Sequence, residues 1–348
     1  MTALHFLLPG DPDSRTGGYR YDARILAGLA ARGWTVHRHR LDASFPHPTA
    51  EALDQAARVL AALPDNARVM IDGLAGGALP GPLRTHAERL RLVLLVHHPL
   101  ALETGLDHDR RARLYDSERA ALAAARRVIV TSPHTRRALA DYGVAAERIG
   151  VVVPGTNPAP LAQGSDWREP RLLCVASLTP RKGHETLFRA LAQLAGLPWR
   201  LRCVGGAHYH PETAARLEQL SSTAGLAGRI ELAGEYDDEG LARAYDEADL
   251  FVLASHYEGY GMVLSEALAR GLPVVATTGG AIPDTVPPDA GFLVPPGDPH
   301  ALAMVLRRVL TDPGLRQQLQ AGARAARAAL PDWPAAAARM ADELDRVG

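Results

Sequence analysis

The chain has 348 residues, of which 47% are hydrophobic and 22% are charged, and its formal net charge is −1. This length is enough for two domains with a core each, and the composition is that of a soluble globular protein. The balanced charge gives no reason to expect a nucleic-acid partner, and no apolar run approaches the ~18 residues needed to cross a bilayer.

The first residues and the two cysteines bear on location. The opening MTALHFLLPG has no basic segment before its apolar run and is interrupted at Pro9, unlike a signal peptide. Cys174 and Cys203 both lie in apolar runs expected to be strands. We interpret them as small core residues in a reducing compartment rather than as metal ligands or a redox pair. A cytoplasmic location is therefore expected.

Strand and helix signals alternate through the first part of the chain. Strands are predicted over 4–8, 35–41, 68–71, 92–96, 128–131 and 149–153, and helices over 19–31, 49–63 and 109–125. This alternation predicts a parallel sheet with helices on both faces. Ligands of such sheets bind beyond the carboxyl ends of the strands.

Polar residues and glycines follow two of these strands. Gly17 and Gly18 lie between the first strand and the first helix, where backbone N–H groups can meet a phosphate. Asp11 and Asp13 form a D-x-D sequence, which we interpret as turn residues of a proline-bearing loop rather than as metal ligands. His97 comes directly after the apolar run 92–96, and a histidine at a strand end is commonly just packed or capped.

A second series of strands and helices follows residues 155–170, which are rich in proline, glycine and small polar residues and which we interpret as a linker. The strand 171–176 leads into SLTPRKGHETLF, in which Arg181 and Lys182 precede a helix that opens at Gly183. Two cations beside helix-end amides suit a diphosphate. Lys182 is the only lysine in the chain, which favours a site that needs a compact ammonium; a stray surface lysine is the alternative.

The most informative stretch is FVLASHYEGYGMVLSEALARGLPVVATT, from Phe251 to Thr278. It reads as a buried strand, a glycine loop, a helix that ends at Gly271 and a second strand. A loop that leads into a helix presents unpaired N–H groups to an anion. Glu258 in the loop can accept hydrogen bonds from sugar hydroxyls, and Glu266 in the helix can accept them from the diol of a ribose.

The segment EGYGMVLSEALARGLPVVAT resembles the E-x7-E region of the retaining glycosyltransferases of family four. The R-K-G segment and the early glycine pair resemble further parts of that family, so the resemblance covers nearly the whole chain. It implies an α/β protein with two Rossmann-like domains, the GT-B fold, and an interdomain cleft. Residues 1–154 would form the acceptor domain together with a C-terminal helix, about 333–348, that crosses back to it, and residues 171–330 would form the donor domain.

The resemblance also implies roles for individual residues. The catalytic residues would be His97, Glu258, Lys182 and Arg181. Of these, His97 and Glu258 would face the donor sugar, and Lys182 and Arg181 would bind the diphosphate. Glu266 would bind the ribose. The other donor-binding residues would be Gly17, Gly18, Ser177, Gly205, Gly259, Tyr260, Gly261, Met262 and Val263. The residues that border the acceptor would be Asp11, Tyr19, His98 and Glu103. Whether His97 or His98 faces the donor stays open.

Two departures from the family pattern concern the donor side. Ala176-Ser177-Leu178 stands where the family often has an arginine after a glycine, so either Arg181 supplies that charge or the phosphate clamp differs. Asp284 stands where the family's G-G-x-x-E segment has a glutamate.

The resemblance implies a retaining, bacterial-type glycosyltransferase of the hexosyltransferase class that uses a UDP- or GDP-linked sugar and a hydroxyl acceptor. Lys182, Arg181 and the helix-end amides would stabilise the leaving diphosphate, so neither a metal ion nor another cofactor is expected. The alternatives are a nucleotide-sugar epimerase of the same fold and a non-catalytic nucleotide-sugar-binding protein. A phosphorylase would need a pyridoxal lysine besides Lys182, and a dehydrogenase would need a G-x-G-x-x-G sequence after the first strand.

Arginines exceed carboxylates in the first half of the chain. A basic face for weak association with an anionic membrane surface could be formed by Arg110, Arg111, Arg113, Arg126, Arg127, Arg136 and Arg137. A solvated surface is the favoured alternative, because no strongly apolar amphipathic helix accompanies these residues.

Overall fold

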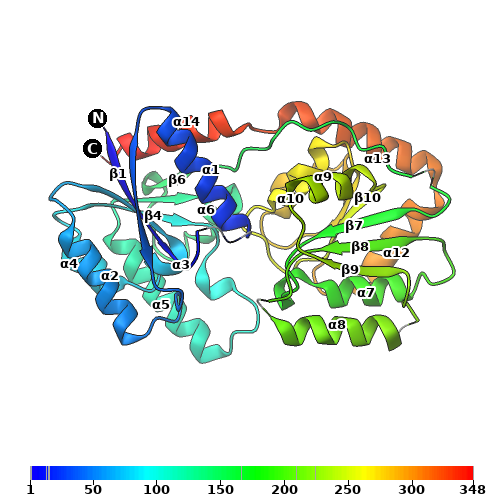
Figure 1. The fold of residues 1–348 in the computed structure, drawn as a ribbon, viewed down its shortest axis with the longest axis horizontal. Helices are drawn as coiled ribbons and strands as arrows, with labels where there is room; N and C mark the ends of the chain where they lie inside the picture. Colours follow the sequence, from blue (N-terminus) through cyan, green and yellow to red (C-terminus); the bar gives the residue numbers. More distant parts are fainter. Residues whose placement is uncertain are drawn as a thin grey trace. The chain divides into compact units, whose positions relative to one another are not determined.

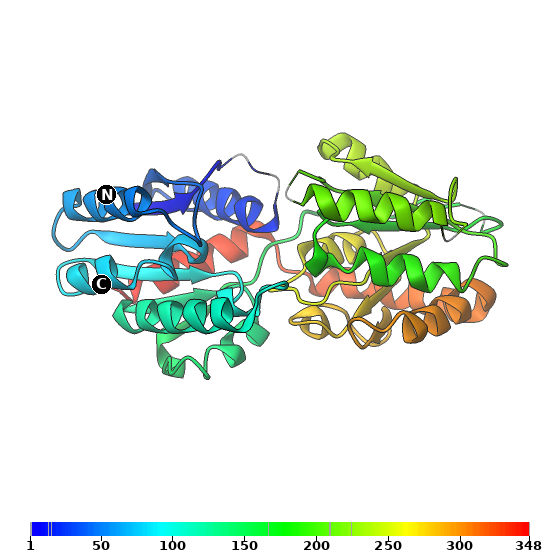
Figure 2. The same cartoon turned by 90° about the horizontal axis from the view of Figure 1, so that it is seen from below.

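The computed structural model describes residues 2–12, 14, 16–165, 167–208, 210–223 and 225–347; Asp13 lies outside them. These residues form two compact units, each a six-stranded sheet with helices on both faces (Figures 1 and 2). Unit 1 comprises Met1–Gly155 and Pro331–Gly348, and unit 2 comprises Thr156–Leu330. The prediction of two Rossmann-like domains is confirmed.

The sheet of unit 1 has the strand order β2-β1-β3-β4-β5-β6, and all pairs are parallel. Its strands are β1 (Ala3–Pro9), β2 (Thr35–Leu41), β3 (Arg68–Asp72), β4 (Arg91–Val96), β5 (Arg127–Val130) and β6 (Ile149–Val151). The order reverses between β1 and β3, and such a reversal marks the place where open parallel sheets bind ligands.

Helices α1 and α14 lie side by side on one face of this sheet, and α2, α4 and α5 cover the other face (Figure 1). The helices and short turns of unit 1 are α1 (Gly17–Ala31), α2 (Ala50–Ala62), α3 (Gly73–Gly76), α4 (Pro80–His86), η1 (Leu100–Leu102), α5 (His108–Ala124), α6 (Pro133–Ala138), η2 (Ala146–Arg148) and α14 (Trp333–Asp345). The sequence pattern did not predict α3. This single turn packs directly on β4, where a Cβ at Gly73 would lie 2.9 Å from the carbonyl oxygen of Leu95.

A buried ion pair ties the last helix to unit 1. Glu343 of α14 is fully buried and pairs with Arg127 of β5, which is 9% exposed, and with Arg339 at 2.8 Å. The basic face considered above therefore cannot include Arg127, because its charge is used inside the protein. The other six arginines of that set are exposed.

The sheet of unit 2 has the strand order β12-β11-β10-β7-β8-β9, again in parallel pairs. Its strands are β7 (Arg171–Val175), β8 (Arg200–Val204), β9 (Ile230–Gly234), β10 (Leu250–Leu253), β11 (Val274–Thr277) and β12 (Gly291–Val294). Here the order reverses between β7 and β10. The loops that follow these two strands are therefore neighbours at one edge of the sheet.

Helices α7, α8 and α12 cover one face of this sheet, and α9, α10 and α13 cover the other (Figures 1 and 2). The helices and turns of unit 2 are η3 (Pro180–Lys182), α7 (His184–Ala192), α8 (Pro211–Thr223), α9 (Asp238–Asp246), α10 (Met262–Ala269), α11 (Ile282–Thr285), α12 (Pro299–Thr311), α13 (Pro313–Ala326) and η4 (Arg327–Ala329). The largest fully buried side chains in the core include Trp199, Tyr245, Phe188 and Phe251. Tyr245 of α9 packs on Phe251 of β10 with ring centroids 5.9 Å apart.

The segment 155–170, interpreted as a linker, belongs to unit 2 from Thr156 onward. The N–H of Ala162 donates to the carbonyl of Arg270 at 2.9 Å, and the hydroxyl of Ser165 donates to Asp249 at 2.6 Å. Asp249 is 3% exposed and also accepts from the N–H of Arg171. The segment thus satisfies a buried carboxylate at the start of β10.

Replacing Glu343 with alanine should destabilise the protein by about 3 kcal/mol or more, because it leaves the buried guanidinium of Arg127 without its carboxylate. The free energy of unfolding from urea denaturation measures this effect. Asp342→Ala is the matched control, since Asp342 is an exposed carboxylate on the same helix and should change stability by less than about 0.5 kcal/mol. Equal stability of the two variants would contradict the assigned role of the pair.

Candidate functional site

Two loops of unit 2 touch where its strand order reverses. One runs from β7 through η3 to Gly183, and the other runs from β10 to Gly261 at the start of α10. The N–H of His256 in the second loop donates to the carbonyl of Arg181 in the first at 2.7 Å. Gly183 has a φ of +66°, and a Cβ there would collide with the carbonyl oxygen of Ala254. Glycine is needed for this close approach.

A buried ion pair joins these loops. Nζ of Lys182 lies 2.6 Å from Oε1 of Glu258, and the two side chains are 15% and 7% exposed. A guanidinium nitrogen of Arg181 lies 3.6 Å from Oε2 of Glu258, and the hydroxyl of Ser255 donates to Oε1 at 2.6 Å. Burial would raise the pKa of Glu258, but the charges of Lys182 and Arg181 hold it below its ordinary value. Two cations around one carboxylate give the group a positive balance, which suits an anionic ligand.

The side chain of Glu266 is held by Tyr245, a core residue of helix α9. The hydroxyl of Tyr245 in α9 donates to Oε2 of Glu266 at 3.0 Å, and the guanidinium of Arg270 lies over the Tyr245 ring at 4.4 Å. Gly261, with φ +86°, is the N-cap residue of α10, and its lack of a side chain leaves the first amides of the helix uncapped by that residue. Glu266 lies in the second turn of the same helix. One short helix therefore carries both an amide cluster and an oriented carboxylate.

A third loop fixes the backbone around Glu258. The N–H of Ala281 donates to the carbonyl of Glu258 at 2.8 Å, and the hydroxyl of Thr285 donates to the carbonyl of Tyr260 at 3.0 Å. Asp284, which stands in the glutamate position of the G-G-x-x-E segment, is exposed on α11. The sequence analysis missed the supporting roles of Ser255, Tyr245 and Thr285.

The other donor-side residues predicted in unit 2 lie close by. Gly259, Tyr260, Met262 and Val263 belong to the loop and first turn of α10. Ser177 and Gly205 follow β7 and β8, and a Cβ at Gly205 would meet the carbonyl oxygen of Ala176 and lie 2.9 Å from the N atom of Ser177. Their packing brings the two strand ends into contact.

In unit 1 the structure surrounds His97 with carboxylates. Its Nε2 lies 3.2 Å from Oδ1 of Asp22, which the sequence analysis did not single out, and 3.3 Å from Oδ2 of Asp72 at the end of β3. The predicted glycine loop is instead the first turn of α1, and a Cβ added to Gly18 would lie 3.4 Å from the imidazole ring of this histidine. Gly17 has no atom within 4 Å of the corresponding position among the described residues.

The residues predicted to border the acceptor differ in their contacts and in their exposure. Nε2 of His98 lies 3.3 Å from Oε2 of Glu103, so these two side chains face each other. The hydroxyl of Tyr19 donates to the carbonyl of Pro9 at 2.6 Å, which holds the end of β1 to α1. Asp11 is exposed. Its partner in the D-x-D sequence, Asp13, falls outside the described residues.

Two groups within the described residues have the spacing of metal ligands. Ligand atoms of Cys174, His184 and Cys203 lie within 4.8 Å of one another, as do those of Asp22, Asp72 and His97. Both cysteines are free and buried in the core, on register partners of β7 and β8. A hydrogen bond from Cys203 lowers the pKa of Cys174 to about 5 in spite of its burial.

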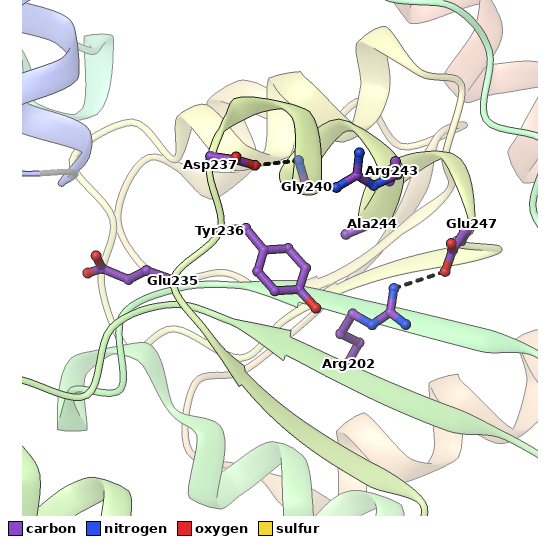
Figure 3. A pocket seen from close by; sticks show the side chains of 8 residues that line it. All are labelled: Arg202, Glu235, Tyr236, Asp237, Gly240, Arg243, Ala244 and Glu247. Atoms are coloured by element: carbon purple, nitrogen blue, oxygen red, sulfur yellow. Dashed lines mark hydrogen bonds and ion pairs between the residues drawn. The ribbon is translucent and has the colours of Figure 1, made fainter.

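A pocket of about 450 Å³ lies beside α9 and β8 (Figure 3). It is lined by Arg202, Glu235, Tyr236, Asp237, Gly240, Arg243, Ala244 and Glu247. The pocket contains none of the residues predicted to bind the donor. Its charges are also satisfied locally, since Arg202 pairs with Glu247 at 2.9 Å and with Glu231 at 2.8 Å.

Two family models match the chain, and they meet at residue 159, close to the division between the units after Gly155. Residues 17–159 match Glycosyltransferase Family 4, and residues 159–326 match Glycosyl transferases group 1. The chain belongs to these glycosyltransferases. Lys182, Glu258 and Glu266 all lie in the stretch matched by the group 1 model.

Related glycosyltransferases are similar over much of the chain. A D-inositol 3-phosphate glycosyltransferase of Xylanimonas cellulosilytica is 33% identical over 259 residues, which are 70% of this chain and 62% of that protein. An MMP alpha-(1->4)-mannosyltransferase of Mycolicibacterium hassiacum is 29% identical over 314 residues, 85% of this chain and 74% of that protein. The match thus spans about three fifths of the length of the first of these relatives.

Solved structures share the two-domain GT-B fold of this chain. Sucrose-phosphate synthase from Thermosynechococcus elongatus matches with a TM-score of 0.85 and 26% identity, over 100% of this chain and 99% of that one. The Anabaena protein HepE in complex with UDP-glucose matches with a TM-score of 0.77 and 20% identity, over 99% of this chain and 100% of that one. Among the residues that the structure describes, no helix has the length and apolar character needed to cross a membrane.

Proposed function

We propose that the chain is a retaining glycosyltransferase that moves a sugar from a UDP- or GDP-linked donor to a hydroxyl acceptor. The observation that carries the proposal is the Lys182–Glu258 pair with Arg181 at the strand-order reversal of unit 2. The names of the relatives, a D-inositol 3-phosphate glycosyltransferase and a sucrose-phosphate synthase, support the same class of reaction. The retaining outcome rests on the family-four resemblance.

Unit 2 would bind the nucleoside diphosphate part of the donor. Lys182 and Arg181 would meet the diphosphate together with the first amides of α10, and Glu266 would accept from the ribose hydroxyls. As the bond to the sugar breaks, negative charge grows on the diphosphate, and preorganised cations and amides stabilise it. In this proposal the two cations replace a metal ion. No side chain is assigned as a general base.

Glu258 has two tasks in this proposal. Its carboxylate orients Lys182, because the 2.6 Å contact fixes the ammonium in one position. Its remaining acceptor capacity would meet sugar hydroxyls. The hydroxyl of Ser255 and the backbone contacts of the third loop keep the carboxylate in place at 5% residue exposure.

Transfer is tested by following UDP-glucose, GDP-mannose and related donors by NMR, with and without candidate polyol and sugar acceptors. We expect slow release of the nucleoside diphosphate without an acceptor, and an α-linked product with one when the donor is α-linked. Conversion of the donor into its epimer in the absence of any acceptor would identify an epimerase. Binding with neither reaction would identify a binding protein.

Lys182→Ala should weaken UDP or GDP binding about tenfold or more, since a hydrogen bond to a charged group contributes about 1.5–3 kcal/mol. Turnover should fall by about 10²–10³, as for the loss of other groups that stabilise developing charge. Calorimetric titration with the nucleoside diphosphate and with the free nucleoside separates the causes, because nucleoside binding should not change. Arg189→Ala, which removes an exposed cation of α7, is the control; an equal loss in both variants would remove the diphosphate assignment.

Glu266→Ala should weaken nucleoside diphosphate binding about tenfold but leave pyrophosphate binding unchanged, because only the ribose contact is lost. Tyr245→Phe removes the hydroxyl that orients Glu266 and should give a smaller loss of the same kind. Competition titrations with the two ligands measure both effects. If pyrophosphate binding fell as much as nucleotide binding, Glu266 would not be a ribose ligand.

A further inference from the structure

Two carboxylates from different elements of unit 1 converge on one imidazole nitrogen. Asp22 comes from α1, Asp72 from the end of β3 and His97 from the residue after β4. Nε2 of His97 lies 3.2 Å from one carboxylate and 3.3 Å from the other. The side chains of Asp22 and Asp72 are 2% and 4% exposed, and that of His97 is 20% exposed. The nitrogen that faces the carboxylates is itself buried.

The surroundings of these carboxylates favour a charged imidazole. Oδ1 of Asp72 accepts from the N–H of Leu74 at 2.9 Å, which fixes this carboxylate as the cap of α3. Neither oxygen of Asp22 has a hydrogen bond of good geometry within the described part of the chain. A neutral Nε2 without a proton would place a third acceptor against two buried carboxylates. A proton on Nε2 gives the carboxylates a donor, and protonation of both ring nitrogens adds the positive charge that offsets two buried carboxylates.

The effects of burial and neighbouring charges on the pKa of His97 also favour a charged imidazole. Burial would lower the pKa of His97, but the charges of Asp22 and Asp72 outweigh it and raise this pKa to about 10. Burial raises the pKa of Asp22 to about 6 against the opposing charge of His97. The ring of Tyr21 stands edge-on to the imidazole at 5.4 Å, and burial keeps that phenol uncharged by raising its pKa. Within the described residues, the titratable side chains in contact with this ring are Asp22, Asp72 and Tyr21.

We infer that Asp22 and Asp72 are positioning residues that keep His97 as an imidazolium and hold its Nε2–H toward the protein, so that Nδ1–H is the donor offered to a ligand. The ligand is a donor sugar only if the proposed function holds; the state of the ring does not depend on it. A charged donor binds a sugar hydroxyl more strongly than a neutral imidazole does. It also means that His97 carries no free lone pair near neutral pH and does not act as a general base.

The test is an NMR titration of the ligand-free protein with ¹⁵N-labelled histidine, in which His97→Gln assigns the His97 signals among those of 14 histidines. In the wild-type protein both His97 nitrogens should keep imidazolium shifts from pH 6 to 8.5. Asp22→Asn should lower the His97 pKa by about one to three units, the usual effect of losing an opposite charge in contact. Asp72→Asn should act in the same direction and decides the question if Asp22→Asn does not fold.

Glu103→Gln is the matched control, because it removes a carboxylate at the same distance from the neighbouring His98 and should leave His97 unchanged. A wild-type His97 that titrates near 6.5, or an unchanged His97 pKa in both aspartate variants, would overturn the inference. A failure of the proposed function would look different. The titrations would come out as expected, while nucleotide sugars neither bound nor reacted.

Discussion

The contact between Lys182 and Glu258 is the interaction on which the candidate site depends. A lone ammonium and a lone carboxylate would each be costly at this depth, so the two are stable only as a pair with further hydrogen bonds. The pair exists because β7 and β10 are neighbours in the sheet although 74 residues lie between them. Gly183 then lets the two following loops approach to backbone contact. The strand order therefore determines where this charge pair can form.

Different residues hold the two glutamates of the candidate site in place. Ser255, Arg181 and the backbone of the third loop hold Glu258, while Tyr245 holds Glu266 from the adjacent helix α9. The two carboxylates thus rest on different elements. A change in one of these supports should alter one of the two proposed contacts with a nucleotide sugar and leave the other in place.

Much of the fold and part of the site could be predicted from the sequence because the signals are local. Lys182, Glu258 and Glu266 each stand in a short motif whose strand, loop and helix can be recognised within a few residues. Asp22 could not be found in this way. It lies between arginines in a helix without any recognisable motif, and its role comes from contact with His97, 75 residues further along the chain. Arg127 was wrongly assigned to an exposed basic face for the same reason, since its partner Glu343 lies 216 residues further along the chain.

The histidine cluster of unit 1 and the ion pair of unit 2 both stabilise buried charges by pairing them, but the numbers of cations and carboxylates are reversed. In unit 2 two cations surround one carboxylate, whereas in unit 1 two carboxylates surround one cation. The first arrangement has positive charge to spare for a phosphate. The second has spare negative charge, which is compatible with hydroxyl groups and with positive charge that develops on a sugar ring.

The placement of α14 affects how the protein is made. Unit 2 ends at Leu330, but unit 1 needs the residues after Pro331 to cover α1 and to neutralise Arg127. During synthesis from the N-terminus, the first unit to begin is therefore the last to be finished, and unit 2 has its whole sequence earlier. Residues 1–155 of a nascent chain therefore stay without α14 and its Glu343 until that helix has left the ribosome.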